Sequence, residues 1–120
     1  MSTFSYKLNE VHPKGWGHEL IITNNKDYCG KLLVFKAGKK FSMHFHKLKH
    51  ETWYVNKGSF FCRTVNLENG SISERTIKEG DVVEIPQFLP HQLEALEDGV
   101  IFEVSTEHFD SDSYRLWKGD

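Results

Sequence analysis

Residues Gly38 to Gly58 read GKKFSMHFHKLKHETWYVNKG, and this stretch decides how the rest of the chain is interpreted. At its centre, His44 and His46 are separated by a single residue. Side chains two residues apart in a β-strand point to the same face, so both imidazoles would project together. Glu51 follows five residues after His46, far enough for a turn to return its carboxylate on a neighbouring strand. Two imidazoles and a carboxylate suit a divalent transition metal with coordination positions left open.

A fourth ligand must come from elsewhere in the chain. The best candidate is His91, at the end of the stretch GDVVEIPQFLPH that begins at Gly80. His91 lies forty residues after Glu51, so only a folded barrel or sandwich can bring the two side chains together.

The remaining sequence is typical of such a fold, because short apolar runs alternate with turn signals about every ten residues. No long segment with helical periodicity competes with this pattern, so we predict an all-β sandwich or barrel formed by one domain, residues 1–120. Trp16, between Gly15 and Gly17, predicts a close chain crossing with a large anchor. Residues 1–14 would form an extended arm or an edge strand, and the tail 106–120 a short helix or a strap. The predicted strands cover 20–23, 31–36, 41–46, 51–56, 59–67, 71–77, 82–85, 92–96 and 100–105.

Composition excludes several classes of function. Fifteen basic and 17 acidic residues give a formal net charge of -2, which does not favour nucleic-acid binding. No apolar run approaches the length that crosses a membrane, and the N-terminal residues lack the apolar segment of a secretory signal. Cys29 and Cys62 are therefore expected to be free thiols of a cytoplasmic protein.

The stretch around the two histidines resembles the first motif of the cupin superfamily. That motif is Gly, five residues, His-x-His, three or four residues, Glu, six residues, Gly. Gly38, His44, His46, Glu51 and Gly58 fill every place, with four residues before the Glu. Five matches at fixed spacing make this resemblance specific.

The second cupin motif is matched in part. It is Gly, five residues, Pro-x-Gly, two residues, His, three residues, Asn. Gly80, Pro86 and His91 stand in their places, whereas Phe88 replaces the second Gly and Ala95 replaces the Asn. The departures leave the metal ligands intact and concern the shape of the loop before His91.

The resemblance implies a single-domain cupin, a double-stranded β-helix or jelly-roll barrel. It also implies that His44, His46, Glu51 and His91 surround one divalent metal ion inside that barrel. Nitrogen and oxygen ligands do not discriminate among Zn, Mn, Fe and Ni.

Within the superfamily, the chain resembles the cupin domain of type II mannose-6-phosphate isomerases over about residues 15 to 115. This resemblance implies aldose-ketose isomerisation of a sugar or sugar phosphate, in which the metal polarises a carbonyl and a base moves a proton between adjacent carbons. The stretches that carry it are 15–19 (GWGHE), 51–53 (ETW), 91–94 (HQLE), and 102–104 with 110–115 (FEV and DSDSYR).

Glu103 and Glu94 are the carboxylate candidates for that base, and Arg115, by resemblance, would bind substrate oxygens. For Glu103 a surface carboxylate is the alternative, and for Arg115 an ion pair in the tail. Alternation in the strand 100–105 groups Glu103 with its neighbours two residues away but does not tell which face lines the cavity. The lysines at 39, 40, 47 and 49 either attract a phosphate or, as we expect, form a solvated face.

The other histidines are not expected to be ligands. His50 precedes Glu51 and would point the opposite way, and His12, His18 and His108 are expected at the surface. 

Two further readings stay open at this point. One is another metal-cupin enzyme, a lyase or an Fe-dependent dioxygenase; some cupin lyases use a Tyr two residues after the metal-binding Glu, where this chain has Trp53. The other is a non-catalytic sugar-binding or regulatory cupin. In all of them the partner is a small molecule, and by analogy the chain would form a homodimer through edge strands and the N-terminal arm.

Overall fold

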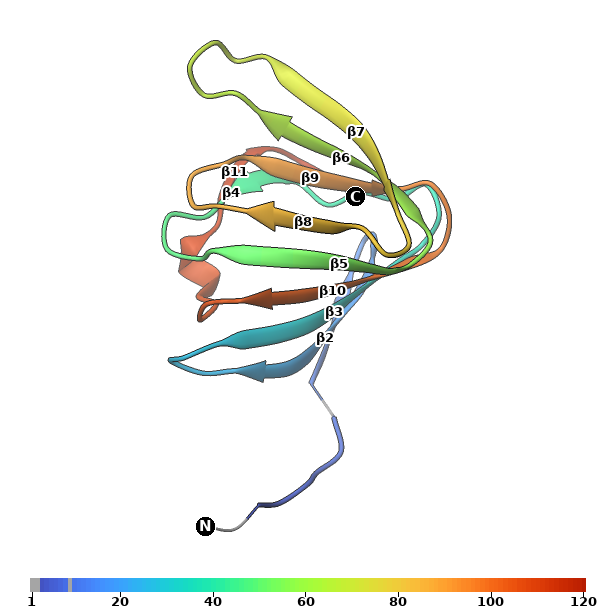
Figure 1. Ribbon diagram of the computed structural model, residues 1–120, viewed down its shortest axis with the longest axis vertical. Coiled ribbons are helices and arrows are strands. Elements are labelled where there is room, and N and C mark those ends of the chain that lie inside the picture. Colours follow the sequence, from blue (N-terminus) through green and yellow to red (C-terminus); the bar gives the residue numbers. More distant parts are fainter. Residues whose placement is uncertain (1–2, 9) are drawn as a thin grey trace.

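The computed structural model describes residues 3–8 and 10–120 and consists almost entirely of β-strands (Figure 1). Every predicted strand is present within a few residues of its expected bounds, so the all-β prediction is confirmed. No helix in the described part of the chain is long and apolar enough to span a membrane. The strands are β1 (Val11–Lys14), β2 (Gly17–Asn24), β3 (Cys29–Phe35), β4 (Met43–Phe45), β5 (Glu51–Lys57), β6 (Ser59–Val65), β7 (Ile72–Lys78), β8 (Val82–Ile85), β9 (His91–Ala95), β10 (Gly99–Ser105) and β11 (Tyr114–Trp117), with a 3-10 helix η1 (Asp110–Asp112).

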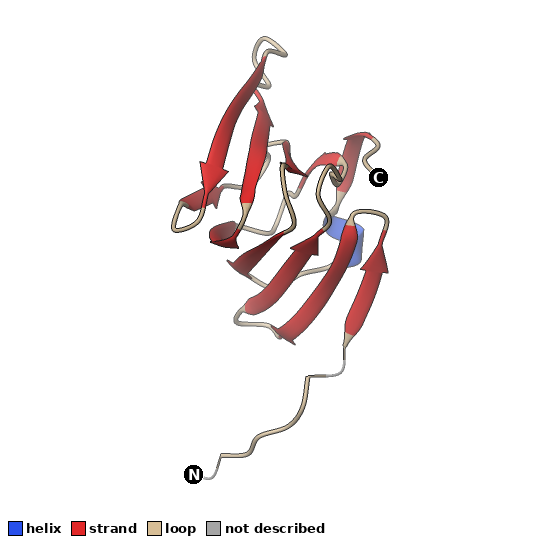
Figure 2. Cartoon of the chain, turned by 90° about the vertical axis from the view of Figure 1, so that its right-hand side faces the viewer, coloured by secondary structure: helices blue, strands red, loops and turns tan. Residues whose placement is uncertain are grey.

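The strands form two antiparallel sheets that face each other, as in a jelly roll (Figure 2). The six-stranded sheet has the order β1-β2-β3-β10-β5-β8, and the five-stranded sheet has the order β11-β4-β9-β6-β7. Neighbours in each sheet are often far apart in sequence; β10, for example, lies between β3 and β5. This topology brings the motif stretch and the stretch ending at His91 together, because β4 pairs with β9.

The two chain ends resolve the alternatives that the sequence left open. The N-terminal segment contains the edge strand β1, where Pro13 is tolerated because one side of the strand needs no ladder hydrogen bond. Residues 3–8 extend away from the body of the molecule (Figure 1), and Met1, Ser2 and Asn9 lie outside the described residues. The tail forms both a short helix and a strap, since η1 leads into β11, which pairs with β4.

The chain crossing predicted at Trp16 is also present. The Trp16 ring is buried and stacks on Phe35 at a centroid distance of 4.4 Å. Gly17 has a φ of 150°, and a Cβ there would lie 1.8 Å from the carbonyl oxygen of Val34. Only glycine allows the two backbones to approach this closely.

Aromatic and aliphatic side chains from both sheets fill one end of the space between them. Trp53 and Phe60 are fully buried there, and Trp53 also contacts the imidazole of His91 at a ring distance of 5.5 Å. Next to this core lies a cavity of about 820 Å³, which is lined by both polar and apolar side chains. The apolar core therefore forms the floor on which the polar site is built.

Candidate metal centre

Three histidines from one sheet converge at the wall of the cavity. His44 on β4 lies directly opposite His91 on β9, and His46 follows just after β4. Their potential ligand atoms all lie within 4.8 Å of one another. The structure thus brings together three of the four residues that the sequence predicts as ligands, and they form a group that can hold a metal ion.

Backbone carbonyls fix the orientation of all three imidazoles. Each ring donates its Nδ1–H to a carbonyl oxygen, which leaves the Nε2 lone pair free. Metal-binding histidines are commonly oriented in this way, by a hydrogen bond at the other ring nitrogen. The acceptors for His44, His46 and His91 are the carbonyls of Ser42, Asp112 and Leu89, at 2.8, 2.6 and 2.9 Å.

The three rings are neutral near neutral pH. Burial lowers the pKa of His44 to about 3 and the pKa of His46 to about 4, with further lowering by His46 and by Lys49, respectively. Burial, followed by the proximity of His44, also holds the pKa of His91 well below its usual value. A neutral imidazole is the form that binds a metal.

Glu51 completes the group from the opposite sheet. Its Oε1 accepts a 2.7 Å hydrogen bond from the indole of Trp53, which holds the carboxylate in place. Its Oε2 lies 3.3 Å from Nε2 of His46 and 3.7 Å from Nε2 of His91. Both Glu51 Oε2 and His91 Nε2 are buried without a hydrogen-bond partner among the described residues. Unpartnered buried polar atoms are costly, and several that face one point fit a bound cation. The donor set therefore fits a divalent metal ion.

Lys49 also enters this site, which the sequence analysis did not predict. The expectation that the lysines form a solvated face is wrong for Lys49, which is only 4% exposed. Its ammonium lies 3.0 Å from Oε2 of Glu103 and 3.7 Å from Oε2 of Glu51. The carboxylate of Asp112 causes this placement, because it accepts hydrogen bonds from the backbone N–H groups of 47–49 and draws the loop inward.

Glu103 lies on the inner face of β10. Strand alternation alone did not tell whether this face lines the cavity, and the structure shows that it does. Glu103 is buried and stands opposite Lys31 in the β3–β10 ladder. Burial alone would raise the pKa of Glu103, but the ammonium groups of Lys49 and Lys31 outweigh burial and lower the pKa to about 2. Burial and then the charge of Glu103 raise the pKa of Glu51 to about 8. Glu103 is thus the carboxylate that remains ionised beside Lys49.

The structure does not bring Glu94 to the cavity. His91, Leu93 and Ala95 occupy the inner positions of β9, and Glu94 points outward, where its carboxylate lies 2.8 Å from Arg63. The suggestion that Glu94 is a base is therefore corrected. Arg115 does line the cavity, on β11 opposite His44, and is solvent-exposed.

Two further histidines lie near the site, His50 outside the cavity and His108 inside it. His50 points away from the cavity toward Glu84 at 3.3 Å, as predicted for a non-ligand. The surface expectation for His108 is wrong, since His108 lines the cavity with Nδ1 3.4 Å from the Lys49 ammonium. Its position in an irregular tail, rather than in a strand, left no sequence signal for this contact.

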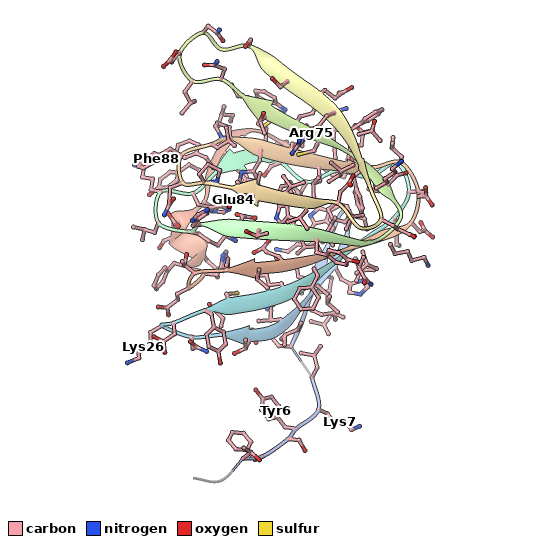
Figure 3. The ribbon with its side chains drawn as sticks, viewed as in Figure 1. Tyr6, Lys7, Lys26, Arg75, Glu84 and Phe88 are labelled. Carbon is pink, nitrogen blue, oxygen red and sulfur yellow. The ribbon has the colours of Figure 1, made fainter. Side chains whose placement is uncertain are left out.

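Phe88 adopts the backbone conformation of the glycine that it replaces in the second motif. Its φ is 68°, and it is the only non-glycine residue with a positive φ in the described part of the chain. Its N–H donates a 2.7 Å hydrogen bond to the carbonyl of His46, so the loop before His91 stays tied to the first motif. Figure 3 shows the side chain at the tip of this loop, directed outward.

A family model described as Cupin matches residues 31–113. The chain belongs to the cupin family. Among solved structures, this cupin is similar to CapF with the inhibitor 3-isopropenyl-tropolone, with 26% identity and a TM-score of 0.82 over 95% of this chain and 36% of that one. A second structure, the capsular polysaccharide assembling protein CapF from Staphylococcus aureus, has 25% identity and a TM-score of 0.83 over 95% and 33% of the two chains.

Oxalate decarboxylase from Bacillus subtilis shares the fold, with 23% identity and a TM-score of 0.79 over 94% of this chain and 31% of that one. This cupin therefore spans about a third of the length of the solved structures it resembles. No curated protein matches its sequence. The cupin prediction is confirmed, while the resemblance to mannose-6-phosphate isomerases stays a prediction.

Proposed function

We propose that this cupin binds one divalent metal ion through His44, His46, His91 and Glu51 and acts on a sugar or sugar phosphate. The observation that carries the proposal is the convergence of three oriented, neutral imidazoles on an unpartnered Glu51 oxygen in a cavity of about 820 Å³. A divalent ion bound there would act as a Lewis acid on a substrate carbonyl or hydroxyl oxygen. The similarity to a capsular polysaccharide assembling protein supports a carbohydrate as the ligand class.

Aldose-ketose isomerisation is the reaction that we propose, and it requires a carboxylate that can accept a proton. Glu103 is ionised at neutral pH and lines the cavity beside Glu51. Arg115 stands at the exposed part of the cavity wall, where a guanidinium can bind a phosphate with two parallel hydrogen bonds. Glu103 would thus accept the proton from the substrate carbon, and Arg115 would bind the phosphate group of the substrate.

A coupled assay of the metal-loaded protein with mannose 6-phosphate, fructose 6-phosphate and related sugar phosphates tests the reaction. Turnover that is lost in Glu103→Gln at unchanged metal content is the expected result. Absence of turnover with every sugar phosphate would contradict the isomerase proposal, although the metal site could still be correct.

A non-catalytic sugar-binding cupin is the alternative that a specific contact favours. The 3.0 Å ion pair with Lys49 lowers the basicity of Glu103, and this suits a hydrogen-bond acceptor for a hydroxyl better than a strong base. Saturable binding of a sugar phosphate by calorimetry, without product formation, would distinguish this alternative from the isomerase.

A homodimer is the assembly that we propose, through the outer face of the six-stranded sheet. Tyr54 and Phe102 face each other across β5 and β10 on this side and are 45% and 38% exposed. Exposed apolar patches of several hundred Å² commonly mark protein interfaces, and a second copy would cover this uncharged row with an identical one. In register across five strands, the row is Leu20, Leu32, Phe102, Tyr54 and Val82.

A further inference from the structure

Two carboxylates lie side by side in the cavity, but only one of them faces the imidazoles. Glu51 and Glu103 are both buried and both line the cavity. Only Glu51 has a short contact to a histidine Nε2, at 3.3 Å from His46. The ammonium of Lys49 binds Glu103 at 3.0 Å and is more distant from Glu51, at 3.7 Å.

We propose that Lys49 is a positioning residue that keeps Glu103 out of the metal coordination set and so reserves a coordination position for an oxygen ligand. The inference rests on the proposed metal site. Glu51 and Glu103 carry the same functional group. In the proposal Glu51 is a metal ligand and Glu103 is not, because the ammonium of Lys49 lies closer to Glu103.

The physical argument is a competition between two cations for one carboxylate. Carboxylate oxygens are good ligands for divalent ions, and the direct contact with Lys49 is closer for Glu103 than for Glu51, which is held toward the imidazoles by Trp53. A charge-assisted hydrogen bond between buried groups is stronger than one in water, and both Lys49 and Glu103 are buried. Lys49 is itself held by the loop 47–49, whose backbone is bound by the Asp112 carboxylate.

Four protein ligands would leave two positions of a six-coordinate ion, which suit a ligand with two adjacent oxygen donors, and Glu103 would occupy one of these positions if it were not held by Lys49. An α-hydroxycarbonyl, as in an open-chain sugar, offers a carbonyl and a neighbouring hydroxyl to one metal ion. Tropolone has the same arrangement of a carbonyl beside a hydroxyl, and an isopropenyl derivative of it inhibits CapF. Tropolone is therefore the probe for the open position.

The experiment measures the Kd for Co²⁺, and then the Kd for tropolone on the Co²⁺-loaded protein, by the visible absorption of Co²⁺. In Lys49→Met, Glu103 should enter the coordination set, so that Co²⁺ binds about tenfold more tightly and tropolone about tenfold more weakly, the range expected for residues around a metal site. The double variant Lys49→Met/Glu103→Gln should regain tropolone binding close to that of the wild type. Lys39→Met, which removes an exposed lysine of the same stretch, should leave both constants unchanged.

Glu103→Gln alone is the second test, and it retains Lys49. Because Glu103 is not a ligand in the proposal, this variant should bind Co²⁺ with a nearly wild-type constant. A loss of Co²⁺ affinity of about a hundredfold would overturn the inference, as would unchanged constants in Lys49→Met. If Lys49→Met does not fold, Lys49→Gln, which also removes the charge but keeps a polar side chain, is measured by the same criteria. A wild-type protein that binds no Co²⁺ would instead overturn the proposed metal site, so the two failures are distinguishable.

Discussion

The two faces of the six-stranded sheet reverse the usual distribution of polar and apolar side chains. The inner face, at the cavity end, carries Lys31, Glu51 and Glu103, all of which are at most 4% exposed. The outer face carries an apolar row in which Val82 is 65% exposed and Phe102 is 38% exposed. Buried charges and exposed apolar patches are the informative exceptions to the rule that hydrophobic residues lie inside. The comparison therefore supports the proposed metal site on one face and the proposed dimer interface on the other.

The inner charges are tolerated because each has an oppositely charged neighbour. Lys49 pairs with Glu103, and Lys31 lies 3.7 Å from Glu19. Buried pairs stabilise little in total, since desolvation offsets the attraction, but the loss of one partner is costly. Glu51 shares the Lys49 contact and retains an unpartnered oxygen, which is the atom that a metal would bind.

The largest expected effect is the loss of metal binding when the cavity loses one of its histidines. His91→Ala should reduce metal content to background in elemental analysis of the purified protein, because it removes one of three converging Nε2 atoms. His50→Ala is the matched control, since His50 points away from the cavity, toward Glu84. Equal metal contents in the two variants would show that the buried polar cluster is not a metal site.

Acid should destabilise the metal-free protein through the three buried imidazoles. In the unfolded chain their pKa is near 6.5, whereas the pKa is about 3 for His44, about 4 for His46 and well below 6.5 for His91 in the folded protein. Between pH 6.5 and about 4 the unfolded state binds more protons, so the free energy of unfolding decreases as the pH falls. Each imidazole contributes up to about 1.4 kcal/mol per pH unit, and the three together contribute about 5 to 6 kcal/mol between pH 7 and pH 5. Glu51, whose pKa is raised to about 8 in the folded protein, acts in the opposite direction and offsets about 2.5 kcal/mol of this.

Urea unfolding in the presence of a chelator, at pH 7 and at pH 5, measures this difference. His91→Gln should reduce the difference between pH 7 and pH 5 by about 2 kcal/mol, because one of the three titrating rings is gone. A free energy of unfolding that is independent of pH over this interval would be incompatible with three buried, neutral histidines.

Removing a charge should cost more on the inner face than on the outer face. Glu103→Ala leaves the buried Lys49 without its nearest partner and should lower the free energy of unfolding by about 3 kcal/mol. Glu94→Ala removes a carboxylate of the other sheet that pairs with Arg63 near solvent, and should cost less than about 1 kcal/mol. Urea unfolding at pH 7 measures the free energy of unfolding of both variants. Similar losses would contradict the prediction that breaking an ion pair is more destabilising inside the barrel than outside it.

A charge placed in the apolar row should separate the dimer without disturbing the inner face. Phe102→Lys is expected to weaken self-association by about thirtyfold or more, the effect of losing an interface residue worth about 2 kcal/mol. Sedimentation equilibrium measures the association, and metal content measures the inner face, which should be unchanged. A wild-type protein that remains monomeric at high concentration would contradict the proposed interface.

Strand alternation explains which parts of the site were predictable. His44, His46, Glu51 and His91 lie in or beside strands at motif spacing, so their meeting point followed from the sequence. The error at Glu94 was avoidable, because a residue three positions from His91 in one strand must face the other way.

Lys49 and His108 were not predictable, because both lie in irregular segments. Their direction depends on hydrogen bonds between distant segments, such as those of the Asp112 carboxylate to the backbone of 47–49. The same limit applies to Glu103: alternation grouped it with its neighbours, and only the packing of β10 between β3 and β5 determined which face is buried.

The smallest expected effect concerns Phe88, in the loop that joins the six-stranded sheet to His91. A φ of 68° is unfavourable for a bulky side chain, by about 1 kcal/mol or more, and the ring itself is 52% exposed. Phe88→Gly should therefore raise the free energy of unfolding by about 0.5 kcal/mol, since the relief of strain is partly offset by the greater freedom of glycine in the unfolded chain. Phe88→Ala is the matched control, because it removes the ring but keeps the Cβ, and it should give no gain. If Phe88→Gly were instead destabilising, the ring would make contacts whose stabilisation outweighs the backbone strain. Phe88 would then be an apolar contact residue, like those of the outer face of the six-stranded sheet.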